Sequence, residues 1–220
     1  MNSLLKIALI HTVLFANSLG AFSQSCYFNT YEEFVAGQYQ PIDTVILSSR
    51  SKNRQKWWGG NDFTIATGDK ATDKILKKNA FAVVHNDTTY VNCRKLRHDK
   101  IPFGNGYVQA RRIGNRSLIF VNRMCDKETS IKASTMSIMF GAIGGLAMAS
   151  QIENQQVCYV ISQGEGSKDY INVLLLDDNL IENMLKGKET LLDEYYAEKK
   201  VTKRRLAKHI IPILEKAGYL

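Results

Sequence analysis

Three pairs of strand-like segments, each joined by a short turn-forming sequence, restrict this chain to a fold that contains antiparallel sheet. The pairs are residues 81–85 with 88–96, 105–113 with 116–124, and 156–162 with 169–176. All are rich in β-branched and aromatic residues, which favour strands. Asn86-Asp87 and Gly114-Asn115 are turn-forming pairs, and a glycine-containing segment joins the third pair. Each pair therefore predicts a β-hairpin.

Helix signals lie before and after these hairpins. Thr30 and Glu33 have capping-box spacing, and Asp69 precedes a short helical segment. Residues 177–220 have helical patterning, with Pro212 expected to kink or restart the last helix. Strands grouped first and helices last indicate an α+β fold rather than alternating βαβ units. The predicted fold is a mainly antiparallel sheet built from hairpins, with a small-residue (Gly/Ala) helix packed on it and a helical C-terminus.

The first residues have the layout of a secretory signal peptide. Lys6 precedes an apolar run, and Ala21-Phe22-Ser23 forms a small-residue cleavage site. We therefore expect residues 1–23 to be removed and residues 24–220 to form one α+β domain of the exported protein, in the periplasm or associated with the outer membrane. Lipidation of Cys26 is disfavoured, because the apolar residue expected three positions before a lipidated cysteine is absent.

Four cysteines remain after this cleavage: Cys26, Cys93, Cys125 and Cys158. An even number in an oxidising compartment permits two disulfides, with three connectivities that the sequence does not distinguish. Cys93 and Cys158 lie in strand-like segments and could equally be buried free thiols. The spacing between the cysteines excludes C-x-x-C redox and zinc motifs.

The positive charge of the chain is concentrated in its first half. Residues 26–132 contain 18 Lys and Arg against 10 Asp and Glu, whereas residues 133–220 contain 10 against 11. A basic surface of this kind attracts polyanions. For an exported protein the available polyanions are lipid headgroups, lipopolysaccharide and acidic glycans rather than nucleic acid. The expected partner is therefore an anionic component of the envelope.

The residues from Ala133 to Ile152 form a stretch of 20 without a charged side chain. As a helix this stretch would be about 30 Å long, which matches a bilayer core. Gly141 and Gly145 have the spacing of closely packed transmembrane helices. However, its polar residues and glycines keep its hydropathy below that of typical spans. We favour a buried or interface-packed helix; a transmembrane helix and a glycine-rich loop are the alternatives.

A basic and aromatic segment, residues 50–58, is the candidate binding surface. Arg50, Lys52, Arg54 and Lys56 alternate, so in an extended conformation all four would point the same way, beside Trp57 and Trp58. Such a surface could bind a polyanion or a glycan. The simpler interpretation is an edge strand whose charges prevent aggregation. The glycines at positions 59 and 60 are expected to form a tight turn with positive φ.

Catalytic and metal sites have little support. Cys93 with His85 or His98 is the sole candidate for a nucleophilic pair of the hydrolase type, and such a pair needs a spatial contact that sequence does not show. The histidines lack metal-ligand spacing, and no phosphate-binding or serine-nucleophile motif is present. We therefore predict no metal, no cofactor and a non-enzymatic binding or structural role. A membrane-anchored component that uses 133–152 is the second hypothesis, and a Cys/His enzyme is the third.

Several segments in order resemble a family of uncharacterised exported envelope proteins of Bacteroidota. They are TYEEF, RSKNRQKWWGGNDF, ILKKNAFAV, TYVNCRKL, GNGYVQA, GAIGG before CYVIS, and LLDEYYAEK. The resemblance covers nearly the whole chain after the signal peptide. It implies export, one compact domain and a Gly-Ala segment that is regularly present. The family has no assigned activity, so the resemblance implies no catalytic residues.

Overall fold

The computed structural model describes residues 24–51, 54–55, 60–114, 116–124, 155–163 and 171–220. The predicted signal peptide (1–23) and the predicted Gly/Ala helix (133–152) lie outside these residues. Among the described residues, no helix has both the length and the apolar character needed to cross a bilayer.

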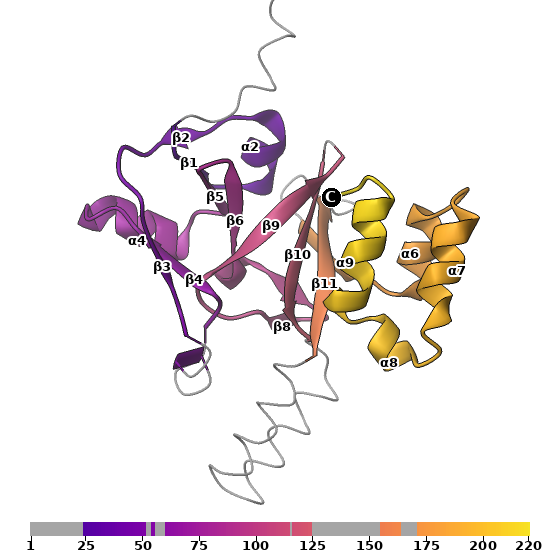
Figure 1. Ribbon diagram of the computed structural model, residues 1–220. Helices are drawn as coiled ribbons and strands as arrows, with labels where there is room; N and C mark the ends of the chain where they lie inside the picture. Colours follow the sequence, from indigo (N-terminus) through magenta and orange to yellow (C-terminus); the bar gives the residue numbers. More distant parts are fainter. Residues whose placement is uncertain (1–23, 52–53, 56–59, 115, 125–154, 164–170) are drawn as a thin grey trace, which may run out of the picture.

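The fold is α+β, with one large antiparallel sheet and a helical C-terminal region (Figure 1). The strand order is β12-β11-β10-β9-β6-β5-β1-β2, and β4 pairs with β9 and carries β3 on its other side. The strands of this sheet are β1 (Cys26–Phe28), β2 (Gln40–Pro41), β3 (Ile46–Ser49), β4 (Phe63–Ala66), β5 (Ala82–His85), β6 (Thr88–Asn92), β9 (Tyr107–Ile113), β10 (Ser117–Arg123), β11 (Gln156–Gln163) and β12 (Ile171–Leu175). A separate pair consists of β7 (Arg97–His98) and β8 (Ile101–Pro102).

All three predicted hairpins are confirmed. β5 pairs with β6, β9 with β10, and β11 with β12, each in antiparallel register. Asn86 and Asp87 form the first turn with φ of 48° and 57°, in the left-handed region that this turn requires. Gly114 begins the second turn with φ of 58°.

The first three of the following α-helices begin directly after capping residues, Thr30, Asp69 and Asp177, whereas the last three begin without a side-chain cap. The helices are α2 (Tyr31–Ala36), α4 (Lys70–Lys78), α6 (Asp178–Met184), α7 (Glu189–Ala197), α8 (Val201–Arg204) and α9 (Ala207–Lys216), with the 3-10 helix η1 (Cys93–Lys95) after β6. Thr30 Oγ1 accepts from the backbone N–H of Glu33 at 3.1 Å, and Asp69 accepts from that of Thr72 at 2.8 Å. The Glu33 carboxylate accepts from the N–H of Asn29, one residue earlier than a capping box predicts.

The break in the last helical segment lies at Leu206, before the proline expected to cause it. Pro212 lies inside α9, and Leu206 between α8 and α9 is extended, with ψ of 139°. Leu206 forms an antiparallel bridge with Val157 of β11. Backbone pairing with the sheet therefore interrupts the helix, a tertiary contact that local sequence does not encode.

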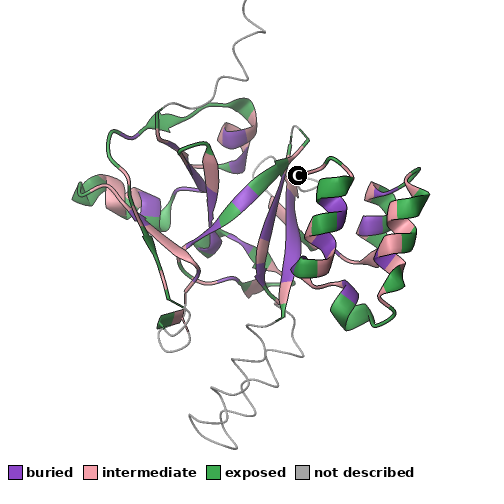
Figure 2. Ribbon diagram, in the orientation of Figure 1, coloured by how far each residue is buried: buried purple, intermediate pink, exposed green. Residues whose placement is uncertain are grey.

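Two faces of the sheet carry different layers. Successive side chains of a strand point to opposite faces, and β9 and β10 divide their residues in this way. On one face, Val108, Ala110, Leu118 and Phe120 join a core with α2 and the segment after β6. On the other face, Tyr107 belongs to a cluster under α4, β3 and β4, whereas Ile119 belongs to a cluster under α6, α7 and α9. Figure 2 shows this burial along β10 and β11.

A buried ion pair holds the C-terminal helices together. Arg204 is 7% exposed, and its Nη2 lies 2.5 Å from Oδ2 of Asp178, the first residue of α6. Tyr195 of α7 donates its hydroxyl to Oδ1 of Asp178 at 2.7 Å. The Arg204 guanidinium also lies over the ring of Tyr196, 4.7 Å from its centroid. One arginine therefore joins α6, α7 and α8.

Replacing Asp178 should destabilise the fold strongly. Asp178→Asn leaves the Arg204 guanidinium buried without a counter-charge, and we expect the free energy of unfolding in urea to fall by about 2–3 kcal/mol. Glu194→Gln is the control, because its ion pair with Lys216 is exposed and should contribute less than about 1 kcal/mol. Equal effects of the two substitutions would contradict this role of Arg204.

The same contact predicts the pH dependence of stability. The hydrogen bond from Arg204 holds the pKa of Asp178 below its ordinary value. The stabilisation of the fold by the ionised Asp178 carboxylate is therefore fully present above the unfolded pKa of about 4. It is lost as the pH falls through the lower pKa of the folded state. The stability difference between the protein and Asp178→Asn should shrink over this acidic range in urea titrations at several pH values.

Candidate binding cleft

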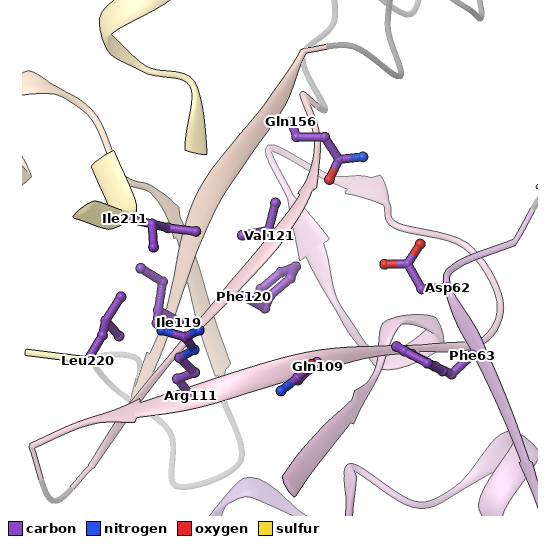
Figure 3. A pocket seen from close by; sticks show the side chains of 10 residues that line it. All are labelled: Asp62, Phe63, Gln109, Arg111, Ile119, Phe120, Val121, Gln156, Ile211 and Leu220. Atoms are coloured by element: carbon purple, nitrogen blue, oxygen red, sulfur yellow. The ribbon is translucent and has the colours of Figure 1, made fainter. Parts of the chain in front are cut away.

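A hollow lies on the sheet face between the cluster under α4 and the cluster under the C-terminal helices. We call it the central cleft, and its volume is about 350 Å³. Its lining residues are Asp62, Phe63, Gln109, Arg111, Ile119, Phe120, Val121, Gln156, Ile211 and Leu220 (Figure 3). Its size lies at the lower end of the range of small-molecule sites.

Strand alternation explains which side chains reach the central cleft. Gln109 and Arg111 are two residues apart on β9, so they share a face, and Ile119 pairs across the strands with Arg111. Val121 follows two residues after Ile119 on β10. The side walls come from distant parts of the chain: Ile211 of α9 on one side and the start of β4 on the other (Figure 3).

The polar groups of the central cleft differ in how they are held. Arg111 Nη1 lies 2.8 Å from Oε1 of Glu215, so its charge is balanced by α9. Asp62 Oδ1 accepts from the side-chain amide of Gln55 at 3.1 Å. Within the described ranges, the side-chain amides of Gln109 and Gln156 form no hydrogen bond to another part of the protein. These two amides are therefore available to a ligand.

A second, smaller hollow of about 40 Å³ extends the central cleft toward the loop before β4. The two hollows share Asp62, Val121 and Gln156. The smaller one is also lined by Asn61 and Asn122, and Asn122 Nδ2 donates to Asn61 Oδ1 at 2.9 Å. Asn61 in turn donates to the backbone oxygens of Phe103 and Asn105, both at 3.1 Å. Buried amides thus fix the shape of this end.

The candidate Cys/His pair is not assembled as a catalytic pair. Cys93 is fully buried, and its Sγ accepts from Asn122 Nδ2 at 3.8 Å. Both ring nitrogens of His98 contact other groups, the backbone oxygen of Val173 and the carboxylate of Asp99. His85 contacts Ser25 and Asn86 in the same way. Neither imidazole is thus placed to take a proton from the thiol. No cluster of three potential metal ligands occurs in the described part of the chain.

The cysteines are not cross-linked as a two-disulfide framework requires. Whichever residue paired with Cys125, that framework would need one bond among Cys26, Cys93 and Cys158, and these three form none with one another. Cys125 lies outside the described residues. Burial raises the pKa of the Cys26 thiol to about 11 and that of Cys158 to about 12, as expected for unreactive thiols in a core.

Arg50 does not point outward from an extended edge. Its guanidinium packs against Gly60, where a Cβ atom would lie 1.6 Å from Nη1 of Arg50. Its backbone N–H donates to the oxygen of Asp62 at 2.7 Å. Gly60 has φ of 95°, as expected for a glycine of a tight turn. Arg50 is thus part of the loop that borders the smaller hollow.

The alternation of basic residues after Arg50 also depends on an extended chain, and the described residues Arg54 and Gln55 are not extended. The backbone N–H of Gln55 donates to the oxygen of Ser51 at 3.0 Å, and Arg54 and Gln55 are helical. Arg50 and Arg54 therefore do not share a face as residues of one strand. Lys52, Lys56, Trp57 and Trp58 lie outside the described residues, so binding by this segment stays a prediction.

An exposed group of lysines lies on α4. Lys70, Lys74, Lys77 and Lys78 follow helical spacing on the side opposite the buried Leu76. Asp73 binds the backbone N–H and hydroxyl of Thr67, at 2.5 and 2.8 Å, instead of a lysine. Within the part of the chain that the structure describes, none of the four ammonium groups forms an ion pair. We call these four residues the α4 lysine face.

Sequence reasoning did not find the central cleft. The alternation of Gln109 and Arg111 along a predicted strand indicates that both side chains share one face. It does not indicate that α9 and β4 border that face while leaving it uncovered. Those walls depend on the placement of residues about 50 and 100 positions away along the chain. The helical spacing of the α4 lysines can be read from the sequence, whereas the exposure of that side of the helix to solvent is seen only in the structure.

Gly106 shapes the loop beside Arg50 and should tolerate no side chain. It has φ of 100°, and a Cβ atom there would lie 2.9 Å from the backbone oxygen of Phe63. Gly68 is the matched control, because its φ is 86° and nothing lies within 4 Å of its Cβ position. Gly106→Ala should therefore lower the unfolding free energy in urea by about 1–3 kcal/mol more than Gly68→Ala. Equal losses would mean that the loop relaxes freely.

Comparison with known proteins gives a family without an activity. No curated protein and no solved structure matches the chain. A family model described as a family of unknown function, DUF6563, matches residues 26–220. This agrees with the expected resemblance to a family without an assigned activity over nearly the whole chain after residue 23, and it carries no information on export. The chain belongs to the family of unknown function DUF6563.

Proposed function

We propose that this protein is an exported, non-enzymatic binding module whose basic N-terminal half contacts an anionic component of the bacterial envelope. The observation that carries the proposal is the α4 lysine face. Four exposed ammonium groups lie on one side of a nine-residue helix, and the neighbouring acidic side chains Asp69 and Asp73 bind Thr72 and Thr67 rather than a lysine.

A second group of exposed basic residues follows β6 and begins near the C-terminal end of α4. Its members are Arg94, Lys95, Arg97 and Lys100. This group begins two residues after Asn92, whose side-chain amide donates to the backbone oxygens of Leu76 and Ala80 at 3.0 and 2.9 Å. The contact attaches the start of the second group to the C-terminal end of α4. Several fixed positive charges favour association with a polyanion over association with a small anion.

The shared chemistry of the expected partner is a dense array of phosphate or carboxylate groups. Each lysine close to an anionic lipid surface contributes about 1 kcal/mol, and the attraction decreases with salt over a distance of about 10 Å. Lipid headgroups, lipopolysaccharide and acidic glycans all present such arrays. The source of the charge is therefore a question for the binding experiment.

Replacing Lys70, Lys74, Lys77 and Lys78 with Gln should weaken binding to the anionic partner at least tenfold. The probes are vesicles containing phosphatidylglycerol, lipopolysaccharide micelles and an acidic polysaccharide, each measured at low and high salt by co-sedimentation or titration. The probe to which the variant binds more weakly than the unsubstituted protein identifies the class of anionic partner. Vesicles of phosphatidylcholine alone should bind neither the unsubstituted protein nor the variant.

The matched control replaces four exposed lysines of the C-terminal part with Gln: Lys186, Lys199, Lys200 and Lys208. This variant has the same net charge as the α4 variant. Unchanged binding of the control would show that position, rather than total charge, determines the interaction. Equal weakening of both variants would leave only non-specific attraction and would contradict the proposal.

Export has its own test. Expressed with its complete N-terminus and a C-terminal tag in a bacterial host, the protein should lose residues 1–23, so that N-terminal sequencing begins at Gln24. Replacing Ala21 and Ser23 with bulky residues should retain the uncleaved form, because the cleavage site requires small side chains. A protein that keeps Met1 and remains in the cytoplasm would contradict export while leaving the vesicle experiment unaffected.

A further inference from the structure

We propose that the central cleft binds an uncharged carbohydrate. In this arrangement sugar hydroxyl groups hydrogen-bond to Gln109, Gln156 and Asp62, and the apolar side of the ring packs against Val121 and Ile211. This site is separate from the α4 lysine face and does not depend on the proposed binding of a polyanion.

The lining of the central cleft is amphipathic in the way that a sugar ring is. Ile119 and Val121 form the floor beside Ile211, while the polar side chains lie around them (Figure 3). The amides of Gln109 and Gln156 each offer a donor and an acceptor, and the Asp62 carboxylate offers acceptors. A hydroxyl group donates and accepts at once, so it can satisfy an amide and a carboxylate side by side. A purely apolar chain would leave the side-chain amides of Gln109 and Gln156 without partners.

The charges of the central cleft favour a neutral ligand. The positive charge of Arg111 is balanced by Glu215 at 2.8 Å, so the guanidinium provides directed N–H groups rather than an unpaired charge. The carboxylate of Asp62, beside the amide of Gln55, would oppose an anionic group. A polyanion bound at the α4 lysine face is therefore unsuited to this site.

The location also distinguishes a sugar from an extended peptide. Peptides that extend a sheet bind to the free backbone groups of an edge strand. The floor of the central cleft is formed by β9 and β10, which are inner strands of the sheet and pair with each other up to Ala110 and Phe120. An extended peptide would find unpaired strand backbone only beside Val121, where this pairing ends, and the polar groups along the rest of the floor are side chains. The smaller hollow continues past Asp62, Val121 and Gln156, but at about 40 Å³ it has no room for a second ring, so the central cleft alone sets the size of the ligand.

The experiment uses the complete exported protein on an array of neutral and acidic oligosaccharides, followed by titration of the best binder. Gln109→Ala with Gln156→Ala should weaken binding about tenfold or more, because two hydrogen bonds to the ligand are lost. The control replaces Gln38 and Gln40 with Ala, two exposed glutamines near β2 at the far end of the sheet. Methyl NMR signals of Ile119, Val121 and Ile211 should shift when the sugar is added.

Two results would overturn the proposal. One is the absence of binding to every oligosaccharide at millimolar concentration, and the other is equal weakening by the Gln38 and Gln40 control. The outcome is independent of the vesicle experiment, because sugar binding should persist at high salt and in the variant without the α4 lysines. The substitutions at Gln109 and Gln156 change one exposed and one half-buried side chain, and thermal unfolding of the variant checks that the fold is intact.

Discussion

The alternation of side chains along β9 and β10 is the constraint on which the rest of the structure depends. These two strands supply residues to three hydrophobic clusters at once. A shift of one residue in their pairing would move every side chain to the opposite face. The register that pairs Ile119 with Arg111 therefore fixes the core with α2 and the positions of both clusters on the other face. It also determines that Gln109 and Arg111 remain uncovered between those clusters.

The remaining elements complete this arrangement with specific polar contacts. Asn92 and Tyr107 bind the backbone oxygens at the end of α4, so the helix is attached through its own unsatisfied carbonyl groups. At the other side, Arg204 joins three helices that have few residues each. Short helices are marginal by themselves, and their stability comes from such tertiary contacts. The helical layers on the two sides of the central cleft are thus attached by different contacts.

Local signals predicted the hairpins and the helix starts because both depend on neighbouring residues. The turn at Asn86-Asp87 and the caps at Thr30 and Asp69 need only a few positions of sequence. The features that local sequence does not determine involve contacts between distant residues. Alternation suggested an extended segment at Arg50 and Arg54, but the close approach of Gly60 and Gly106 turns the arginine into the loop. A proline suggested a break that the bridge between Leu206 and Val157 makes earlier.

The central cleft joins parts of the chain that are synthesised at very different times. Its floor comes from β9 and β10, whereas one wall comes from α9, about 100 residues later. During synthesis the sheet face at Gln109 and Ile119 can form well before α9 leaves the ribosome. Until α9 reaches the sheet, Ile119 has no cover and Arg111 has no Glu215. A chain whose C-terminal helices have not yet reached the sheet therefore exposes the side chain of Ile119, which the finished fold buries beside the central cleft.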